Sequence, residues 1–86
     1  MNVTSKGRYA LRIMVDLARR TDEGYVSLKT IADRTDSSMK YMEAIVGSLK
    51  KAELIDSTRG KEGGYKLARK PEEYSVGEIL RCVEDN

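Results

Sequence analysis

Apolar residues recur at helical spacing along several segments of the chain, and one further segment alternates as a strand does. The clearest helical pattern lies at residues 38–52, where an apolar stripe at positions i, i+3, i+4 and i+7 is formed by Met42, Ile45, Val46 and Leu49. The other side of this helix carries Ser38, Lys40, Tyr41, Ser48 and Lys51. The pattern therefore predicts an amphipathic helix whose outer face is cationic and rich in hydrogen-bond donors.

A β-hairpin is predicted directly after this helix. Residues 54–67 have the order strand, glycine-rich turn, strand, and in the returning strand Tyr65 and Leu67 alternate with a lysine. Three glycines permit positive φ at the tip: Gly60, Gly63 and Gly64. We expect the tip of the hairpin, the wing, to span residues 58–64.

Two helices are predicted before residue 38. The first begins at a cap on Thr4 or Ser5 and continues to about Arg19 or Arg20. Its expected inner stripe is Ala10, Leu11, Met14, Leu17 and Ala18, widened by Ile13 and Val15. A loop and a short strand at Tyr25 and Val26 follow, and Ser27 then caps a short helix at residues 28–34.

The turn at residues 35–37 joins this short helix to the amphipathic one. Two helices with a turn of three or four residues between them, the second of them basic, fit the helix-turn-helix template. Glycine is usual in such a turn, and here we expect side-chain hydrogen bonds of Asp36 and Ser37 to replace it.

Ser75 and Glu78 form a capping box that opens a fourth helix. Its expected inner residues are Val76, Ile79, Leu80 and Val83. The predicted fold is mainly α with a small β-hairpin, a winged helix-turn-helix.

Composition limits the architecture to one small domain. The chain has 86 residues, 40% of them hydrophobic, with no Phe or Trp, so the core must be aliphatic with Met and Tyr filling gaps. The net charge of +2 conceals an asymmetry: residues 37–70 hold eight Lys or Arg against four Asp or Glu, and residues 71–86 hold one against five. A basic region attracts polyanions, although charge alone equally fits an ordinary solvated surface.

Residue types that most enzymes and metal sites need are scarce. The chain contains one cysteine and no histidine, which removes an intrachain disulfide, a thiolate cluster and the commonest general base. We therefore expect no enzymatic activity. No apolar run approaches the roughly 20 residues of a membrane span, and no signal-peptide pattern opens the chain, so a cytoplasmic location is expected.

The amphipathic helix and the hairpin supply the candidate binding residues. A DNA major groove admits one α-helix, whose first turns reach the base edges. The candidates there are Ser38, Lys40, Tyr41 and Glu43. Ionised Glu43 can only accept a hydrogen bond, which suits a cytosine amino group, and the alternative is a solvated carboxylate.

Arg59 stands at the entry to the wing with Lys61 nearby, where an extended arginine can enter a narrow minor groove. The alternative for Arg59 is a solvated loop charge. In the first turns of the first helix, Lys6 and Arg8 oppose the helix dipole, which suggests compensation by an external anion. For Arg12, one turn further on, we favour a role in solubility only.

Four blocks of this sequence resemble the Rrf-two family of bacterial transcription regulators. The blocks are residues 4–11, 26–32, 40–43 and, most specifically, 59–68, which reads R-G-K-E-G-G-Y-K-L-A. The likeness runs from Met1 to about Glu84. The family includes the iron–sulfur cluster regulator, the nitric-oxide-sensitive repressor and the cysteine-metabolism repressor.

The resemblance implies a sequence-specific DNA-binding regulator, and we expect a repressor. It implies a homodimer on a palindromic operator, with helix 38–52 in the major groove and wing 58–64 in the minor groove. Carried over by position, the phosphate-holding residues would be Lys6, Arg8 and Tyr9. The residues at the base edges would be Ser38, Lys40, Tyr41 and Glu43. The wing tip would be Arg59 and Gly60.

This chain departs from the family in two respects. Cluster-binding members carry three closely spaced cysteines beyond the fourth helix, whereas here Cys82 precedes that position, so no iron–sulfur cluster is expected in this chain. The family's long dimerisation helix and sensor loop also lie beyond the given sequence, and we expect residues 1–86 to be the DNA-binding domain.

The alternative function is a winged-helix protein-interaction module without DNA binding. The exposed cations Lys40, Arg59 and Lys61 argue against it, because interface centres are usually depleted in charge.

Overall fold

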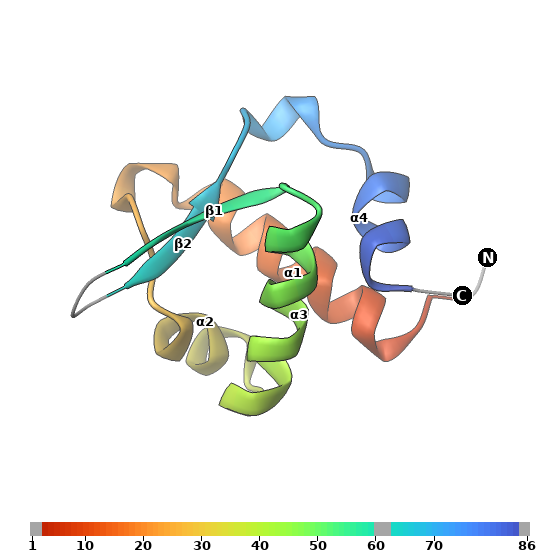
Figure 1. Cartoon of the computed structure of the whole chain (residues 1–86), viewed down its shortest axis with the longest axis horizontal. Coiled ribbons are helices and arrows are strands. Elements are labelled where there is room, and N and C mark those ends of the chain that lie inside the picture. The colour runs from red at the N-terminus through yellow and green to blue at the C-terminus, as the bar shows by residue number, and fades with distance from the viewer. Residues whose placement is uncertain (1–2, 60–62, 85–86) are drawn as a thin grey trace.

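The computed structural model describes residues 3–59 and 63–84. Within these ranges the chain forms four α-helices, two short 3-10 helices and one antiparallel pair of strands, in the arrangement drawn in Figure 1. In chain order the elements are α1 (Ser5–Arg19), η1 (Thr21–Glu23), α2 (Leu28–Thr35), α3 (Met39–Lys51), β1 (Ile55–Thr58), β2 (Gly64–Leu67), η2 (Pro71–Glu73) and α4 (Val76–Val83). The predicted winged helix-turn-helix is confirmed.

Each α-helix begins at a hydroxyl side chain that satisfies a free backbone N–H of the first turn. The caps are Thr4, Ser27, Ser38 and Ser75. The predicted capping box at the start of α4 is present, with both the Ser75 and the Glu78 side chain bonded to the backbone. These caps fix the helix starts by local chemistry, which is why the sequence located them well.

The turn between α2 and α3 is made by the backbone rather than by side chains. Asp36 adopts a left-handed conformation with φ of 53°, which aspartate tolerates better than most residues. The Ser37 N–H donates to the carbonyl of Ala32 at 3.0 Å. The side-chain hydrogen bonds expected of Asp36 and Ser37 are not found among the described residues, so that expectation was wrong.

The core lies where α1, α2 and α3 meet, and α4 closes it from the side of α1. All four residues of the predicted α3 stripe are buried, namely Met42, Ile45, Val46 and Leu49. Ile13, expected only to widen the α1 stripe, is fully buried at its centre. Two predictions were wrong: Val15 is 53% exposed and Val76 is 59% exposed. Both lie at the edge where α1 faces α4, and no described element covers them.

The hairpin is tied to the helices at two points. Val26 forms a single β-bridge with Tyr65, with both backbone hydrogen bonds at 2.8 Å, so the predicted strand at Tyr25 and Val26 is reduced to one bridge. Gly64, at φ of 156°, passes so close that an added Cβ would lie 3.0 Å from the backbone of Val26. The paired strands project past α2, away from α4 (Figure 1).

The base of the hairpin is held by a tyrosine that lies before α4. The Tyr74 hydroxyl donates to the carbonyl of Leu54 at 2.7 Å and accepts from the Arg69 N–H at 2.9 Å. The Arg69 guanidinium stacks over the Tyr74 ring at 4.6 Å and pairs with Glu78 at 2.6 Å. The wing base is therefore linked to the first turn of α4 through Tyr74, Arg69 and Glu78.

Candidate nucleic-acid interface

The outer face of α3 is fixed by what its inner face buries. Because a helix advances by about 100° per residue, the side opposite to the buried stripe carries Lys40, Ala44, Gly47 and Lys51, all of which are exposed. Glu43 is also exposed, at the edge of this side. Two cations flanking two small residues give a surface that a nucleic-acid groove can approach closely.

Ser38 caps α3 and is also a predicted base-edge residue. Its Oγ accepts the Tyr41 backbone N–H at 3.1 Å, which caps the helix. The side chain is exposed, and its hydroxyl proton remains able to donate. The predicted base-edge role of Ser38 is therefore compatible with the cap, but only as a donor from the helix end.

Tyr41 is half-buried instead of lying free on the outer face. Its ring meets the ring of Tyr9 edge to face, with centroids 5.3 Å apart and an interplanar angle of 88°. Tyr9, on α1, is half-buried as well. The sequence pattern placed Tyr41 on the polar side of α3, and the structure turns that edge of α3 toward α1.

The three predicted phosphate ligands of α1 do not share one face. Lys6 and Arg8 are two positions apart, which separates them by about 200° around the helix axis. Arg8 is exposed, whereas Lys6 is half-buried on the side of α4. Lys6 lies close enough to Cys82 to affect its pKa. Burial and the Glu78 carboxylate both raise the pKa of the Cys82 thiol, and the positive charge of Lys6 lowers it. Lys6 and Arg8 therefore lie on different sides of α1, and the phosphate contacts predicted for Lys6, Arg8 and Tyr9 stay predictions.

Ion pairing divides the cations of the molecule into two groups. Among the described residues, the paired cations tie helices and turns together: Arg20 and Arg34 to Asp16 and Glu23, Lys29 to Asp33, and Arg69 to Glu78. In the same part of the chain, the remaining cations form no ion pair: Lys6, Arg8, Arg12, Arg19, Lys40, Lys50, Lys51, Arg59, Lys66, Lys70 and Arg81. Cations of the second group can meet an external anion without first breaking an ion pair within the described residues.

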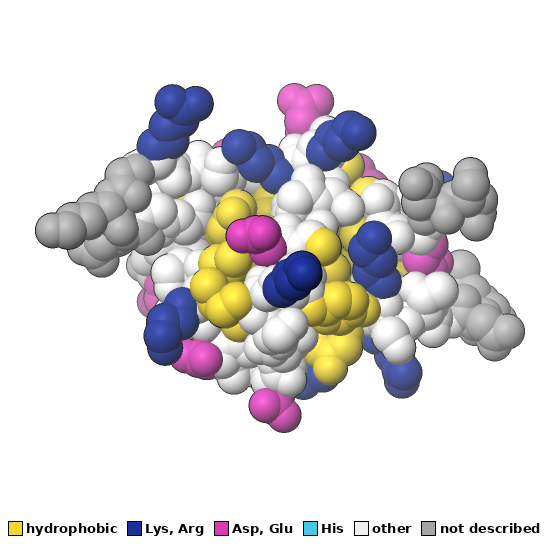
Figure 2. Space-filling model, turned by 60° about the horizontal axis from the view of Figure 1, so that its bottom comes forward, with side chains coloured by type: hydrophobic (Ala, Val, Ile, Leu, Met, Phe, Trp, Pro, Cys, Tyr) yellow, Lys and Arg dark blue, Asp and Glu magenta, His cyan; other side chains and the backbone are white. Residues whose placement is uncertain are grey.

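Arg59 is exposed where β1 ends, at the start of the wing. Its backbone carbonyl accepts a hydrogen bond from the Thr58 hydroxyl at 3.3 Å. Gly60 and Lys61, also predicted to bind DNA, lie outside the described residues. Figure 2 shows the side of the molecule that carries α2 and the start of α3, where Lys and Arg side chains, with Asp and Glu side chains among them, lie around apolar patches.

Arg12 is the residue whose position the sequence interpretation missed. Its guanidinium carbon lies 5.4 Å from the centroid of the Tyr9 ring, and so next to the contact between α1 and α3. The spacing i, i+3 between Tyr9 and Arg12 was a signal that the two side chains could meet on α1. The presence of Tyr41 beside them could not be read from the sequence.

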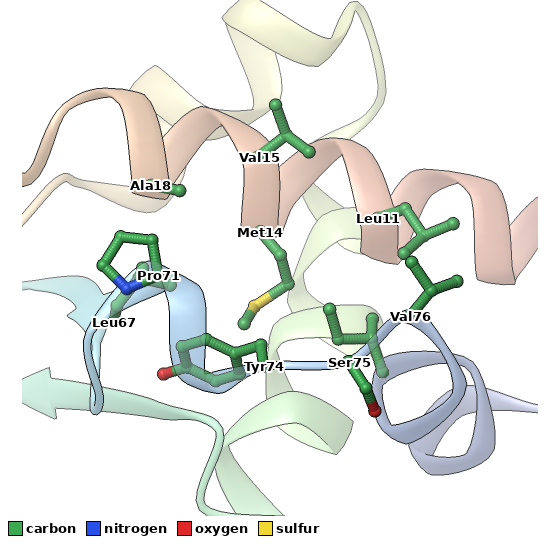
Figure 3. A pocket seen from close by; sticks show the side chains of 10 residues that line it. Leu11, Met14, Val15, Ala18, Leu67, Pro71, Tyr74, Ser75 and Val76 are labelled. Carbon is green, nitrogen blue, oxygen red and sulfur yellow. The ribbon is translucent and has the colours of Figure 1, made fainter.

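The apolar cavity between α1 and the segment before α4 is a separate feature (Figure 3). It has a volume of about 170 Å³ and is lined on α1 by Leu11, Met14, Val15 and Ala18. These positions lie on the side of α1 opposite to Tyr9. No charged side chain lines the cavity, and its polar side chains are those of Tyr74 and Ser75.

No helix in residues 3–59 and 63–84 is long and apolar enough to cross a membrane. Within the same ranges, no three His, Cys, Asp or Glu side chains gather as metal ligands do. Cys82, the chain's one thiol, is half-buried, and its raised pKa disfavours the thiolate that metals bind. The donor set of the described residues does not fit an iron ion or an iron–sulfur cluster.

Comparison with known proteins places the chain among bacterial regulators. A family model described as "Iron-dependent Transcriptional regulator" matches residues 3–86. The HTH-type transcriptional regulator IscR of Aliivibrio salmonicida is 43% identical over 86 residues, which cover 100% of this chain and 51% of that protein. The HTH-type transcriptional regulator CymR of Bacillus subtilis is 43% identical over 84 residues, covering 98% and 61%.

Solved structures agree in fold. IscR of T. potens has a TM-score of 0.89 at 46% identity, over 99% of this chain and 62% of that one. The B. subtilis global cysteine regulator CymR has a TM-score of 0.91 at 42% identity, over 98% and 65%. The chain thus spans between half and two thirds of the length of these relatives. With the motif block at residues 59–68, the four helices and hairpin described above, and a family match over nearly its whole length, the chain belongs to the Rrf2 family of transcriptional regulators.

Proposed function

We propose that this chain is the DNA-binding part of a transcription regulator. In this proposal α3 enters a major groove and presents Lys40, Glu43 and the donor of Ser38 to base edges. The wing, entered at Arg59, reaches the adjacent minor groove. The names of the relatives, which are HTH-type transcriptional regulators, support the proposal.

The observation that carries the proposal is the row of exposed cations on α3 and at the start of the wing, namely Lys40, Lys50, Lys51 and Arg59, none of which forms an ion pair with a described residue. Among the described residues, exposed cations without an ion pair lie on α1, α3 and at the end of β1, elements that the winged helix-turn-helix places against DNA, while others, such as Lys70 and Arg81, lie elsewhere. Unpaired cations bind phosphates by releasing counterions, and they need not first break a contact within the protein.

Four finer statements belong to the same proposal. We propose that the protein acts as a repressor, in the cytoplasm, as a homodimer on a palindromic operator, and without an iron–sulfur cluster held by the residues of this chain. Two-fold symmetry in the protein would be mirrored in the DNA, with half-sites about one helical turn apart. Light scattering of the protein–DNA complex measures the stoichiometry, and one chain per duplex would contradict the dimer.

The test starts from a pool of random-sequence duplexes about 30 base pairs long, roughly three turns of B-DNA. The chain is used to enrich a binding sequence, and fluorescence anisotropy then compares the enriched duplex with a scrambled one. We expect the enriched duplex to bind at least about tenfold more tightly, because each well-read base pair contributes about 1–3 kcal/mol.

Three variants connect the binding to the proposed residues. Lys40→Ala and Arg59→Ala should each weaken binding to the enriched duplex. Arg81→Ala is the matched control, because it removes one exposed positive charge from α4, away from the proposed interface. If no sequence is enriched, and Arg59→Ala binds duplex DNA as the unmodified chain does, the proposed function is contradicted. The results would then favour the alternative, a protein-interaction module without DNA binding.

A further inference from the structure

We propose that Tyr9, Arg12 and Tyr41 act as one unit, the Tyr9 cluster, in which Tyr9 is a positioning residue and Arg12 a phosphate-binding residue. The ring of Tyr9 contacts both the ring of Tyr41 and the guanidinium of Arg12, and it holds them where the backbone of a duplex would bind. This proposal rests on the proposed function, because it assigns roles within the same interface.

The contact between the two rings joins two helices. Tyr9 lies in the second turn of α1 and Tyr41 in the first turn of α3, and their centroids are 5.3 Å apart at 88°. Edge-to-face pairs prefer this geometry, so each ring restricts the orientation of the other. Tyr41 follows Lys40 directly, and the Tyr9 ring therefore sets the angle at which the start of α3 meets a groove.

Both phenolic hydroxyls of the cluster are accessible to a ligand. Neither hydroxyl forms a hydrogen bond with another described residue. In the described part of the chain, the buried polar side-chain atoms without a hydrogen-bond partner are Asp16 Oδ2 and Arg34 Nε. The two phenolic oxygens have no such partner either, so they are not buried. The rings are half-buried and pack against the core, while their oxygens reach solvent. The Tyr41 hydroxyl is thus a donor on a rigid support.

Arg12 is exposed and has been left out of the pairing around it. Asp16 lies one turn further along α1, the usual partner spacing, yet it pairs with Arg20 at 3.1 Å and with Arg34 at 3.4 Å. Arg12 instead stacks over Tyr9 at 5.4 Å. A stacked guanidinium keeps its N–H edges free, and those edges match a phosphate. The favoured sequence interpretation, that Arg12 serves solubility alone, does not account for this arrangement.

The Tyr9 cluster makes a different prediction from a direct phosphate contact by the Tyr9 hydroxyl. If Tyr9 acts through its ring, removal of the hydroxyl leaves binding intact and loss of the ring weakens it. If the hydroxyl itself holds a phosphate, the two changes weaken binding alike. The variants Tyr9→Phe and Tyr9→Leu separate these cases, since only the first keeps the ring.

The experiment measures anisotropy with the enriched duplex over a series of salt concentrations. We expect Tyr9→Phe to bind within about twofold of the unmodified chain and Tyr9→Leu to bind about tenfold more weakly, which is the scale of one lost charge-assisted contact. Arg12→Ala should weaken binding and lower the slope of log K against log salt by about one. Arg19→Ala is the matched control, because it removes an exposed arginine from the same side of α1, without a described aromatic partner.

A double variant tests the link between the two residues. When Tyr9→Leu is already present, adding Arg12→Ala should weaken binding by less than it does alone, because the guanidinium has lost its support. Thermal unfolding of every variant gives the temperature range in which it is folded, and binding is measured there. The salt slope counts phosphate contacts, so a merely destabilised variant does not change it.

The outcomes separate the two proposals. If the unmodified chain binds no duplex, the proposed function fails, and the Tyr9 cluster fails with it. If the unmodified chain binds but Tyr9→Phe is as weak as Tyr9→Leu, or Arg12→Ala keeps the full salt slope, only the cluster proposal is overturned. A neutral Tyr9→Phe, a weak Tyr9→Leu and a reduced slope in Arg12→Ala together support it.

Discussion

Gly7 and Gly47 both lie inside helices, but their surroundings differ completely. A Cβ added to Gly7 would lie 2.6 Å from Glu84 Oε1 and 2.9 Å from Leu80 Cδ2, because α1 and α4 approach each other there. A Cβ added to Gly47 would meet no atom within 4 Å. Gly7 therefore serves packing, whereas Gly47 keeps the outer face of α3 small at the expense of helix stability.

Replacing each glycine by alanine should change stability in opposite directions. Gly7→Ala forces Glu84 away from Thr4, whose backbone N–H and hydroxyl donate to it at 2.9 and 3.0 Å. We expect a loss of about 1–2 kcal/mol in the free energy of unfolding, the usual cost of overpacking. Gly47→Ala should raise it by about 0.5–1 kcal/mol through helix propensity. Urea unfolding followed by circular dichroism measures both, and equal shifts in the two variants would contradict the difference in packing.

The base of the wing is connected to α4 by a short chain of hydrogen bonds and one ion pair. The Tyr74 hydroxyl bridges the backbone on either side of the hairpin, at Leu54 and Arg69. Arg69 then carries the connection on to Glu78 in the capping box of α4. The hairpin has only one strand pair of its own, and isolated hairpins are marginally stable, so this bridge and the Val26 contact set its direction.

Removing that bridging hydroxyl should destabilise the domain. In Tyr74→Phe the carbonyl of Leu54 and the N–H of Arg69 each lose their hydrogen bond to the half-buried Tyr74 hydroxyl. We expect a loss of about 1–3 kcal/mol in the free energy of unfolding, the cost of leaving such groups unsatisfied. Tyr25→Phe is the control, because Tyr25 is exposed and its ring still stacks with Lys66. A loss as large in the control would show that the bridge is not the cause.

Acid should weaken the same connection. The hydrogen bond from the Arg69 guanidinium, with a further one from the Ser75 backbone, holds the pKa of Glu78 below its ordinary value despite partial desolvation. Since the folded pKa lies below the unfolded one, ionised Glu78 stabilises the fold above the unfolded value, roughly pH 4 to 5, and this contribution is lost as the pH falls through the folded value.

The melting temperature measured from pH 7 down to pH 3 checks this dependence. Glu78→Gln keeps the shape of the side chain but cannot ionise, so its melting temperature should fall less steeply on the acid side than that of the unmodified chain. Parallel curves for the two proteins would mean that Glu78 does not contribute to the pH dependence.

At the scale of the molecule, charge is divided along the chain. Residues 37–70 are basic and residues 71–86 acidic. In the structure the basic part forms α3 and the hairpin, whereas α4, in the acidic part, packs against the N-terminal part of α1 (Figure 1). A field of this kind orients the molecule as it approaches a polyanion.

Cations that differ in pairing should differ in their effect on salt dependence. Arg8→Ala removes an exposed, unpaired cation of α1 that is predicted to hold a phosphate, and we expect the slope of log K against log salt to fall by about 0.9 per lost phosphate contact. Arg20→Ala removes a cation paired with Asp16 and Glu23, and the slope should stay unchanged. Anisotropy with the enriched duplex at several salt concentrations gives both slopes. A slope reduced equally in both variants would contradict the division by pairing.

The sequence by itself determined the elements and the family. Helix starts were predictable because Thr4, Ser27, Ser38 and Ser75 cap their helices through bonds to residues three positions on, which is local chemistry. The α3 stripe was predictable because burial of one helix face imposes its period on the sequence. The base-edge, phosphate and wing assignments stay predictions, with Gly60 and Lys61 outside the described residues.

Only the tertiary structure decided which side chains meet. Periodicity gives the direction of a stripe but not its width, so Val15 and Val76 were assigned to the core when no described element packs over them. Tyr9, Arg12 and Tyr41 come together from two helices that are distant in sequence, through the crossing of α1 and α3. Lys6 and Arg8 are near neighbours in sequence and diverge around one helix. Contacts of this kind depend on the angles and distances at which helices pack, and those are set by the whole core at once.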